Sequence, residues 1–268
     1  MSRYAKSGGV LHEITGRYAK VNGVWQQVTA RYAKNNGAWN QVYSSGKKLS
    51  DLPVGSLLKI NESGVPQQYI VVHQGNPNTS IYDSSCHGTW ILRKNVVSSM
   101  AWEFGNYSSS PIHSYLNGSF LATFDSDTQS NILQIKIPYA ESYDSSTINA
   151  LANGLSTKIF IPAVKELGIV QYPLSTEQST IPDEGAVLSY FDYPNGSDLY
   201  LSRSTNSEWW TRSLSLSAAR YVIYVHSTGE ITASENCTNS SGVRPAMILN
   251  STALVSTSPD SDNCYTLQ

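Results

Sequence analysis

The first 45 residues repeat one alternation of polar and apolar positions three times. Arg-Tyr-Ala-Lys opens each copy at positions 3, 17 and 31, a period of 14 residues, and each copy continues through a Gly-containing turn into a second apolar stretch. Glycine in a two-residue turn between such stretches is typical of a β-hairpin. A hairpin this small cannot bury its own face, so the copies must pack on another surface. We therefore expect residues 1–45 to form a small all-β module of three hairpins.

The polar residues 44–48 predict a linker. The strand and helix patterns after it are assigned to a second domain, which spans residues 50–268. The apolar runs at 68–73 and 89–92 predict buried strands. Ser110-Pro111 is typical of a helix start, and the apolar positions after it share one helical face, which predicts a helix near 111–122. Asp127 is expected to cap a second helix near 127–134, and residues 162–167, closed by a glycine, predict a short helical turn.

The last third of the chain returns to strand patterns. Residues 220–226 and 230–232, separated by a Ser-Thr-Gly turn, predict a hairpin, and residues 242–249 predict a final core strand. Along residues 221–226 one set of alternating side chains should face inward and the other outward. Few short helices among many strands indicate an α+β fold, because no regular strand–helix alternation is present.

Composition excludes several classes of function. Charged residues make up 14% of the chain and the net charge is −2, without a basic run, so no nucleic-acid partner is expected. No apolar stretch approaches the roughly 20 residues of a membrane span, so no membrane insertion is expected. The first residues lack the apolar core of a signal peptide, which predicts synthesis in a cytoplasm without that secretion route. The 17 tyrosines and abundant Ser and Asn suit a recognition surface.

Candidate chemistry is sparse. The common hydrolase, zinc-protease, phosphate-loop and dinucleotide motifs are missing from the sequence, so we expect no enzyme, no cofactor and no metal. Cys86 and His87 are adjacent, which on a strand points them to opposite faces. Three distant cysteines indicate free thiols, with a Cys237–Cys264 bridge as the alternative. Asp260 and Asp262, like Asp125 and Asp127, keep a hard-cation site open as a weaker alternative.

Five motifs in order carry a family resemblance, and they lie at residues 52–55, 90–92, 115–120, 209–213 and 242–246. They resemble gut-bacterial and phage domains of unknown function that are related to the formylglycine-generating-enzyme branch of the C-type lectin fold. The resemblance implies a C-type-lectin-like fold after the hairpin module. It also raises an oxidase alternative, but the closely spaced cysteine pair of those enzymes is missing here. The calcium-binding motifs of sugar-binding C-type lectins are also missing.

The same ending is similar to variable proteins of diversity-generating retroelements, in which a fixed scaffold holds a diversified C-terminal segment. The matching segment here is about 213–241, and it is rich in residues that asparagine-codon randomisation produces. The N-terminal repeats resemble hairpin repeats of phage tail and fibre proteins. These resemblances imply a receptor-binding protein on a virion (phage tail) or a bacterial cell surface. Its expected partners are a host-surface protein or glycan, and virion tail components bound through the repeats.

Two sets of residues follow from this hypothesis. Two adjacent indoles cannot both be exposed cheaply, and buried arginines can tie strands together, so structural anchors are expected at Trp209, Trp210, Arg212, Gly242, Arg244 and Pro245. Ligand contacts are expected on one contiguous patch formed by Ser215, Ser217, Arg220, Tyr221, Ile223, Tyr224, His226, Asn236, Thr238 and Asn239. An arginine that grips an anionic ligand, an ordinary polar hairpin, and a structural decoration protein without a ligand remain open alternatives.

Overall fold

A computed structural model of the chain describes the backbone of short strands in the first 45 residues and then residues 46–141, 147–169, 182–192, 199–215, 221–231 and 234–268. The contacts divide the chain into two compact units, Met1–Lys47 and Lys48–Gln268. Each unit is described separately below.

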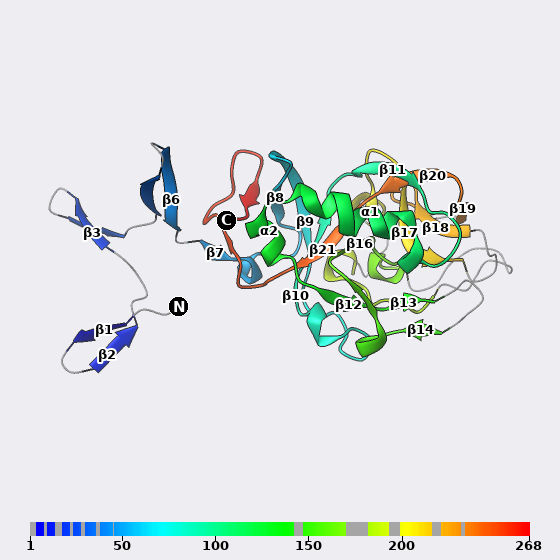
Figure 1. Cartoon of the computed structure of the whole chain (residues 1–268), viewed down its shortest axis with the longest axis horizontal. Helices are drawn as coiled ribbons and strands as arrows, with labels where there is room; N and C mark the ends of the chain where they lie inside the picture. Colours follow the sequence, from blue (N-terminus) through cyan, green and yellow to red (C-terminus); the bar gives the residue numbers. More distant parts are fainter. Residues whose placement is uncertain are drawn as a thin grey trace. The chain divides into compact units, whose positions relative to one another are not determined.

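Unit 1 contains three pairs of antiparallel strands, one pair for each sequence repeat (Figure 1). Their registers bring Ser7 opposite Val10, Val21 opposite Val24, and Asn35 opposite Ala38, so two residues connect the strands of each pair. The strands are β1 (Tyr4–Ser7), β2 (Val10–Glu13), β3 (Tyr18–Val21), β4 (Val24–Gln27), β5 (Ala30–Asn35) and β6 (Ala38–Ser44). The glycine turns themselves lie outside the described residues.

Unit 2 is built on two larger sheets. The six-stranded sheet has the order β16 (Ile159–Phe160), β21 (Ala246–Leu249), β10 (Gly88–Arg93), β9 (Val65–Gly75), β8 (Leu57–Glu62) and β23 (Cys264–Thr266). The five-stranded sheet has the order β11 (Ser98–Ala101), β20 (Ser240–Val243), β17 (Trp209–Leu214), β18 (Tyr221–Val225) and β19 (Ser234–Asn236). Neighbouring strands are antiparallel, except that β23 pairs parallel to β8 and β17 parallel to β20.

Smaller elements complete unit 2. Three short sheets pair β7 (Lys47–Lys48) with β22 (Leu254–Val255), β12 (Ile135–Ile137) with β15 (Leu155–Thr157), and β13 (Tyr139–Ala140) with β14 (Ile148–Asn149). The residues expected to be a linker therefore include a strand. The α-helices are α1 (Pro111–Tyr115), α2 (Ser126–Asn131) and α3 (Leu199–Arg203). Short 3-10 turns occupy Leu49–Asp51, Ser84–Cys86, Tyr107–Ser109, Leu151–Asn153, Lys165–Leu167 and Ser189–Phe191. This mixture of sheets and short helices is α+β, as the sequence predicted.

The predicted first helix is present but changes its hydrogen-bonding pattern along its length. The side chain of Ser110 accepts from the amide of His113, and Pro111 is the first helical residue. After α1 the helix continues as a π-type turn over Leu116–Phe120 and a 3-10 turn over Leu121–Thr123. A run of three helical geometries in one short segment is typical of a helix whose path is set by packing rather than by propensity.

The second helix begins and ends earlier than predicted. Asp125, not Asp127, is its N-cap, because the Asp125 carboxylate accepts from the Thr128 amide at 2.7 Å. The expected apolar residues Ile132 and Leu133 lie beyond its end. Ile132 forms a bridge with Leu249, and the Leu133 amide donates to the carbonyl of Ile248. Backbone pairing with the six-stranded sheet therefore outweighs the local helical pattern.

The predicted final strand over 242–249 is two strands in two different sheets. β20 ends at Val243 and β21 begins at Ala246, with Arg244-Pro245 between them. Pro245 has no amide to donate, so a continuous ladder would break at this position. Its carbonyl instead accepts from the amide of Arg93 at 2.8 Å.

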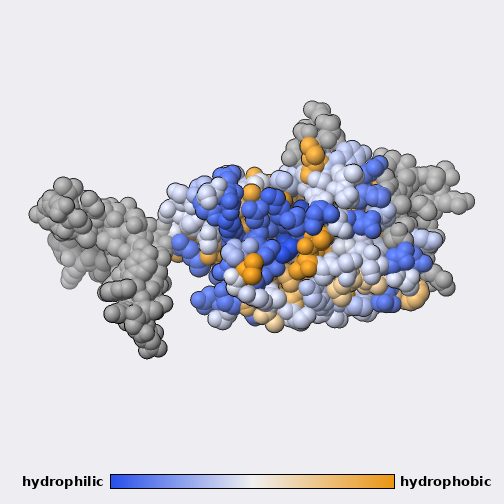
Figure 2. Space-filling model, turned by 90° about the horizontal axis from the view of Figure 1, so that it is seen from above, coloured by the Kyte–Doolittle hydropathy of each residue, from blue (hydrophilic) through white to orange (hydrophobic). Residues whose placement is uncertain are grey.

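The core of unit 2 is continuous across both sheets and the helical segment. Trp90, Trp102, Phe120, Phe160 and Trp209 are almost fully buried in it, together with most of the aliphatic residues of the strands. On the face shown in Figure 2, hydrophilic residues predominate and hydrophobic residues form small separate groups. Among the described residues no helix is long and apolar enough to cross a membrane.

The contact pattern predicts that unit 2 folds without unit 1. A chain that begins at Gly46 keeps β7 and Leu49, whose amide donates to Ala253 and whose side chain is fully buried. We expect this truncation to melt in a single transition within a few degrees of the unit 2 transition of the full chain, measured by circular dichroism. Loss of the near-ultraviolet aromatic signal in the truncation would show that residues 1–45 complete the core.

Candidate ligand-binding surface

β17 is the central anchor of the candidate surface. Trp209 and Trp210 point to opposite faces of the strand, yet both are fully buried. Each indole nitrogen finds a backbone acceptor, the Arg203 carbonyl for Trp209 at 3.2 Å and the Met100 carbonyl for Trp210 at 2.9 Å. Because both faces of β17 are covered, this strand has little freedom to move relative to the rest of the core.

Arg212 lies on the same strand and is bound on all sides. Its guanidinium donates to both carboxylate oxygens of Glu166 at 2.7 and 2.6 Å, and neither side chain is exposed. It also donates to the carbonyls of Ile161, Glu184 and Pro138. A bidentate pair whose arginine makes three further hydrogen bonds to carbonyls offsets much of the cost of burying two charges. The pair fixes β17 to the segments that contain residues 138, 161–166 and 184.

A second buried carboxyl group lies beside this pair. Glu184 is 1% exposed, and one of its oxygens accepts from the amide of Ala140 at 3.0 Å. Burial raises the pKa of Glu184 to about 7, although the nearby positive charge of Arg212 opposes the shift. Glu184 is therefore largely protonated at mildly acidic pH, when an exposed glutamate would be charged.

Arg244 ties the two sheets together. Its Nε donates to the carbonyl of Arg93 at 2.8 Å, its Nη1 donates to the carbonyl of Arg203 at 3.0 Å, and its guanidinium lies 4.9 Å from the centre of the Trp209 ring. Burial lowers the pKa of Arg244. Within the described ranges, the Arg244 guanidinium contacts two carbonyls and an indole ring, and no carboxylate lies within ion-pair distance of it.

Gly242 allows the close approach of strands β17 and β20. A side chain at this position would place its first carbon 2.5 Å from the Glu208 carbonyl oxygen and 2.6 Å from a methyl of Val96. The Gly242 amide donates to that same Glu208 carbonyl at 3.0 Å. Gly242 and the buried Pro245 are thus structural positions on either side of Arg244.

The exposed part of the candidate surface lies at one end of the five-stranded sheet. Tyr221 is 41% exposed and stands directly opposite Asn236, so the two side chains share a face of the sheet. A tight turn follows, in which the Asn236 side chain accepts from the amide and hydroxyl of Thr238, and the Asn239 amide donates to the Asn236 carbonyl. Thr238 and Asn239 are exposed. Residues 221, 236, 238 and 239 form what we call the tip surface.

Phe104 adjoins the tip surface and was not anticipated from the sequence. It is 60% exposed, and the preceding amide of Glu103 donates to the Cys237 carbonyl at 2.9 Å. Glu103 has a positive φ of 65°, which a residue with a side chain adopts at a cost, so the surrounding structure must hold this loop in place. The fully buried Trp102 anchors the loop and packs edge-on against Trp210. An aromatic residue among Glu, Gly and Asn gives no periodic signal, so a pattern analysis could not find it.

The remaining predicted contact residues lie elsewhere. Ser215, Ile223 and Tyr224 are buried. Ile223 and Tyr224 belong to β18, which is covered on both faces and does not alternate between core and solvent. Ser215 follows β17, and its amide donates to the Tyr221 carbonyl. Tyr224 packs against Trp210 and His226. His226 itself is half-buried at the opposite end of β18 from Tyr221, about 17 Å along the strand. Ser217 and Arg220 lie outside the described residues. The contiguous patch is therefore smaller than the sequence predicted.

The tip surface combines one aromatic ring with hydroxyl and amide groups, which suits noncovalent recognition. Among the described residues, no group of three or more His, Cys, Asp or Glu side chains could hold a metal ion. Cys86, Cys237 and Cys264 are buried and unbridged, which contradicts the alternative of a Cys237–Cys264 disulfide. Asp260 and Asp262 both bind the ammonium of Lys59, at 2.7 and 2.5 Å. The ammonium of Lys59 therefore occupies the position that the hard-cation alternative assigned to a metal ion.

The fold is an α+β domain in which a firmly anchored sheet ends in a small, exposed, uncharged surface. A family model described as a domain of unknown function (DUF6273) matches residues 87–251, and the chain belongs to this family. The matched range includes every anchor residue and the whole tip surface. No curated protein and no solved structure matches the chain significantly.

Replacing Arg244 should destabilise unit 2 strongly. The Arg244→Ala variant loses two charge-assisted hydrogen bonds and the contact with Trp209, and it removes one donor from each of the carbonyls of Arg93 and Arg203. We expect the free energy of unfolding to fall by about 3 kcal/mol in urea titrations. Lys48→Ala, which removes an exposed cation, should change it by no more than about 0.5 kcal/mol. Equal effects of the two substitutions on the free energy of unfolding would show that Arg244 does not anchor the fold.

The raised pKa of Glu184 predicts a pH dependence of stability. The folded chain holds this proton up to about pH 7, whereas the unfolded chain releases it near pH 4.5, so stability falls as pH rises between these values. The contribution is about 3 kcal/mol across this window. Glu184→Gln should lack this decline, so the difference in unfolding free energy between variant and native chain should grow from pH 5 to pH 8 in urea titrations. A difference that stays constant with pH would contradict the assignment.

Proposed function

We propose that unit 2 is a non-enzymatic ligand-binding domain with a C-type-lectin-like fold, and that it presents the segment at about 213–241 to a host ligand. The observation that carries this proposal is the position of the tip surface. It lies at the end of unit 2 opposite to the point where the chain enters through β7 (Figure 1). A domain attached at one end and exposed at the other suits presentation of a ligand-binding surface.

The proposed ligand is a host-surface protein or glycan. Tyr221 and Phe104 supply aromatic contact area, and Asn236, Thr238 and Asn239 supply hydrogen-bonding groups. Rigid aromatic anchors beside adaptable polar groups are typical of paratopes that bind without a metal. The uncharged character of these five side chains favours a ligand recognised by stacking and hydrogen bonds over one recognised by charge.

The attachment to a particle would come from unit 1. We propose that its hairpins dock the chain to tail components of a phage virion or to another surface structure. Three strand pairs with a fixed sequence period would offer equivalent binding elements to a symmetric or repetitive partner. Diversification by a retroelement would then act on the exposed positions of unit 2, while β17, β20 and their buried arginines stay unchanged.

A structural decoration protein without a specific ligand is the second candidate. The burial of Ser215, Ile223 and Tyr224 favours it, since these residues were expected to contact a ligand. The two candidates differ in whether the tip surface binds anything, so one binding experiment separates them.

Combined replacement of the tip surface should abolish binding but leave the fold intact. The probe is a panel of whole bacterial cells stained with fluorescently labelled protein and measured by flow cytometry. The variant Phe104→Ala/Tyr221→Ala/Thr238→Ala/Asn239→Ala should stain recognised cells at least tenfold less, with a melting temperature close to that of the native chain. The matched control Asn61→Ala/Val65→Ala/Thr257→Ala changes exposed positions on other elements and should stain normally. Equal staining by the native chain and the tip variant would favour the decoration protein.

Diversification is testable in the genome that encodes the chain. A neighbouring reverse-transcriptase gene should be accompanied by a template repeat that matches the coding sequence of residues 213–241. Mismatches between the two copies should fall on the codons of exposed tip positions and spare those of the buried Ser213, Val222 and Val225. Mismatches spread evenly over buried and exposed codons would argue against directed diversification.

A further inference from the structure

Residues 182–192 form a segment, outside all of the described strands, that lies against the buried pair of Arg212 and Glu166. Arg212 donates to the Glu184 carbonyl at 2.9 Å. A side-chain carbon added at Gly185 would lie 3.0 Å from Cγ of Glu166, so the backbone of the segment touches the pair directly. We call residues 182–192 the strap, because they close over this ion pair.

A histidine fastens one end of the strap to strand β9. Nδ1 of His73 accepts from the backbone amide of Ser189 at 3.3 Å and lies 2.8 Å from the Ser189 hydroxyl oxygen. An amide N–H only donates, so Nδ1 must be unprotonated, and the neutral ring carries its hydrogen on Nε2. His73 is half-buried with its ring edge-on to Trp90, and Ser189 is exposed. The contact therefore requires the neutral form of His73.

Protonation of His73 would break this contact. The Ser189 hydroxyl can turn to accept from a protonated Nδ1, but the Ser189 amide cannot turn. The Leu188 amide before it donates to the Glu166 carbonyl at 3.1 Å, and the Phe191 amide after it donates to the Leu188 carbonyl at 2.8 Å, which fixes the backbone here. Two N–H groups would then point at each other, so the ring and the strap must separate.

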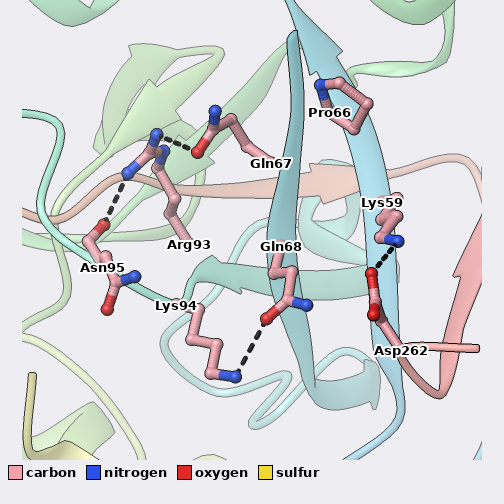
Figure 3. Close-up of a pocket in the computed structure, with 8 residues that line it drawn as sticks. All are labelled: Lys59, Pro66, Gln67, Gln68, Arg93, Lys94, Asn95 and Asp262. Carbon is pink, nitrogen blue, oxygen red and sulfur yellow. Dashed lines mark hydrogen bonds and ion pairs between the residues drawn. The ribbon is translucent and has the colours of Figure 1, made fainter.

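The surroundings of His73 offer no charge that would stabilise a protonated ring. Among the described residues, no carboxylate lies within ion-pair distance of it. The titratable groups on the strap and on the neighbouring turns are Asp51, His87, Asp183, Glu184, Tyr190 and Asp192. The cations Lys59, Arg93 and Lys94 lie at the opposite end of β9, where each donates to a partner (Figure 3). Burial therefore lowers the pKa of His73 below its ordinary value of 6.5.

We propose that the contact between His73 and Ser189 is an acid-released latch, which holds the strap closed while His73 is neutral and lets it open when the ring is protonated. With the strap open, His73 lies in water and binds a proton more readily than in the closed state. Closure is thus fully favoured above the ordinary pKa of histidine and weakens as the pH falls through the lower pKa of the closed state. The latch uses no residue of the tip surface, so it is independent of the proposed function.

Hydrogen exchange of backbone amides in the full chain tests the latch, measured by ¹H–¹⁵N nuclear magnetic resonance at pH 7 and pH 5. The native chain is compared with His73→Asn, whose side-chain oxygen can accept at the position of Nδ1 but does not titrate. From pH 7 to pH 5, protection of the Ala186, Leu188 and Ser189 amides in the native chain should fall about threefold or more relative to the variant. Every other titratable group is present in both chains, so the comparison at one pH cancels its titration.

Two results of this comparison would overturn the proposal. An unchanged ratio of protection between the native chain and His73→Asn would show that the strap does not respond to His73. A loss confined to the Ser189 amide would show that the ring alone turns away while the strap stays closed. His87→Asn is the matched control, because it removes an exposed histidine beside β10, and it should leave the exchange of the strap unchanged. An equal effect of His87→Asn would trace the response to net charge and would also overturn the latch.

Direct titration of the imidazole rings in the native chain completes the test and does not depend on the folding of any variant. The His73 ring should titrate at a lower pH than the exposed His87 ring, because the closed strap disfavours its charged form. A His73 ring that titrates at the same pH as His87, or at a higher one, contradicts the latch.

Discussion

The buried ion pair between Arg212 and Glu166 is the interaction on which the arrangement of unit 2 depends. It joins strand β17 to three separate stretches of chain through the carbonyls of Pro138, Ile161 and Glu184. The Tyr82 hydroxyl donates to the same carboxylate at 2.6 Å, which brings in a fourth stretch. A single missing partner would leave an uncompensated charge in the core, so these segments must assemble together.

The sequence predicted the parts of the fold that local patterns specify. Ser110-Pro111 marked the start of the first helix, because capping and the fixed φ of proline act within a few residues. The end of the second helix was predicted wrongly, because Ile132 and Leu133 pair with β21 over a hundred residues away. Arg244-Pro245 was placed inside a strand, although it turns the chain between two sheets. Such features depend on distant partners that a periodic pattern does not contain.

The candidate surface shows the same limit. Alternation predicted that one of Ile223 and Tyr224 would be exposed, and both were expected to contact a ligand, yet both faces of β18 are covered. The expected hairpin joined residues 220–226 to 230–232, whereas β18 pairs with Ser234–Asn236, so the Tyr221–Asn236 pair was not predicted and Phe104 could not be associated with it. Its place beside the tip depends on one backbone hydrogen bond from Glu103 to Cys237 and on the indole of Trp102 beneath the loop.

The turn at Arg244-Pro245 has a consequence for cooperativity. It places β20 and β21 in different sheets within ten consecutive residues, and the Arg244 side chain binds carbonyls from outside both strands. Neither sheet can therefore lose its strand without pulling on the other, which favours all-or-none unfolding of unit 2. In a domain that unfolds as one unit, every destabilising substitution draws on the same free energy of unfolding. Substitutions at the tip can then accumulate until their summed cost approaches that free energy of unfolding, whichever side chains are involved.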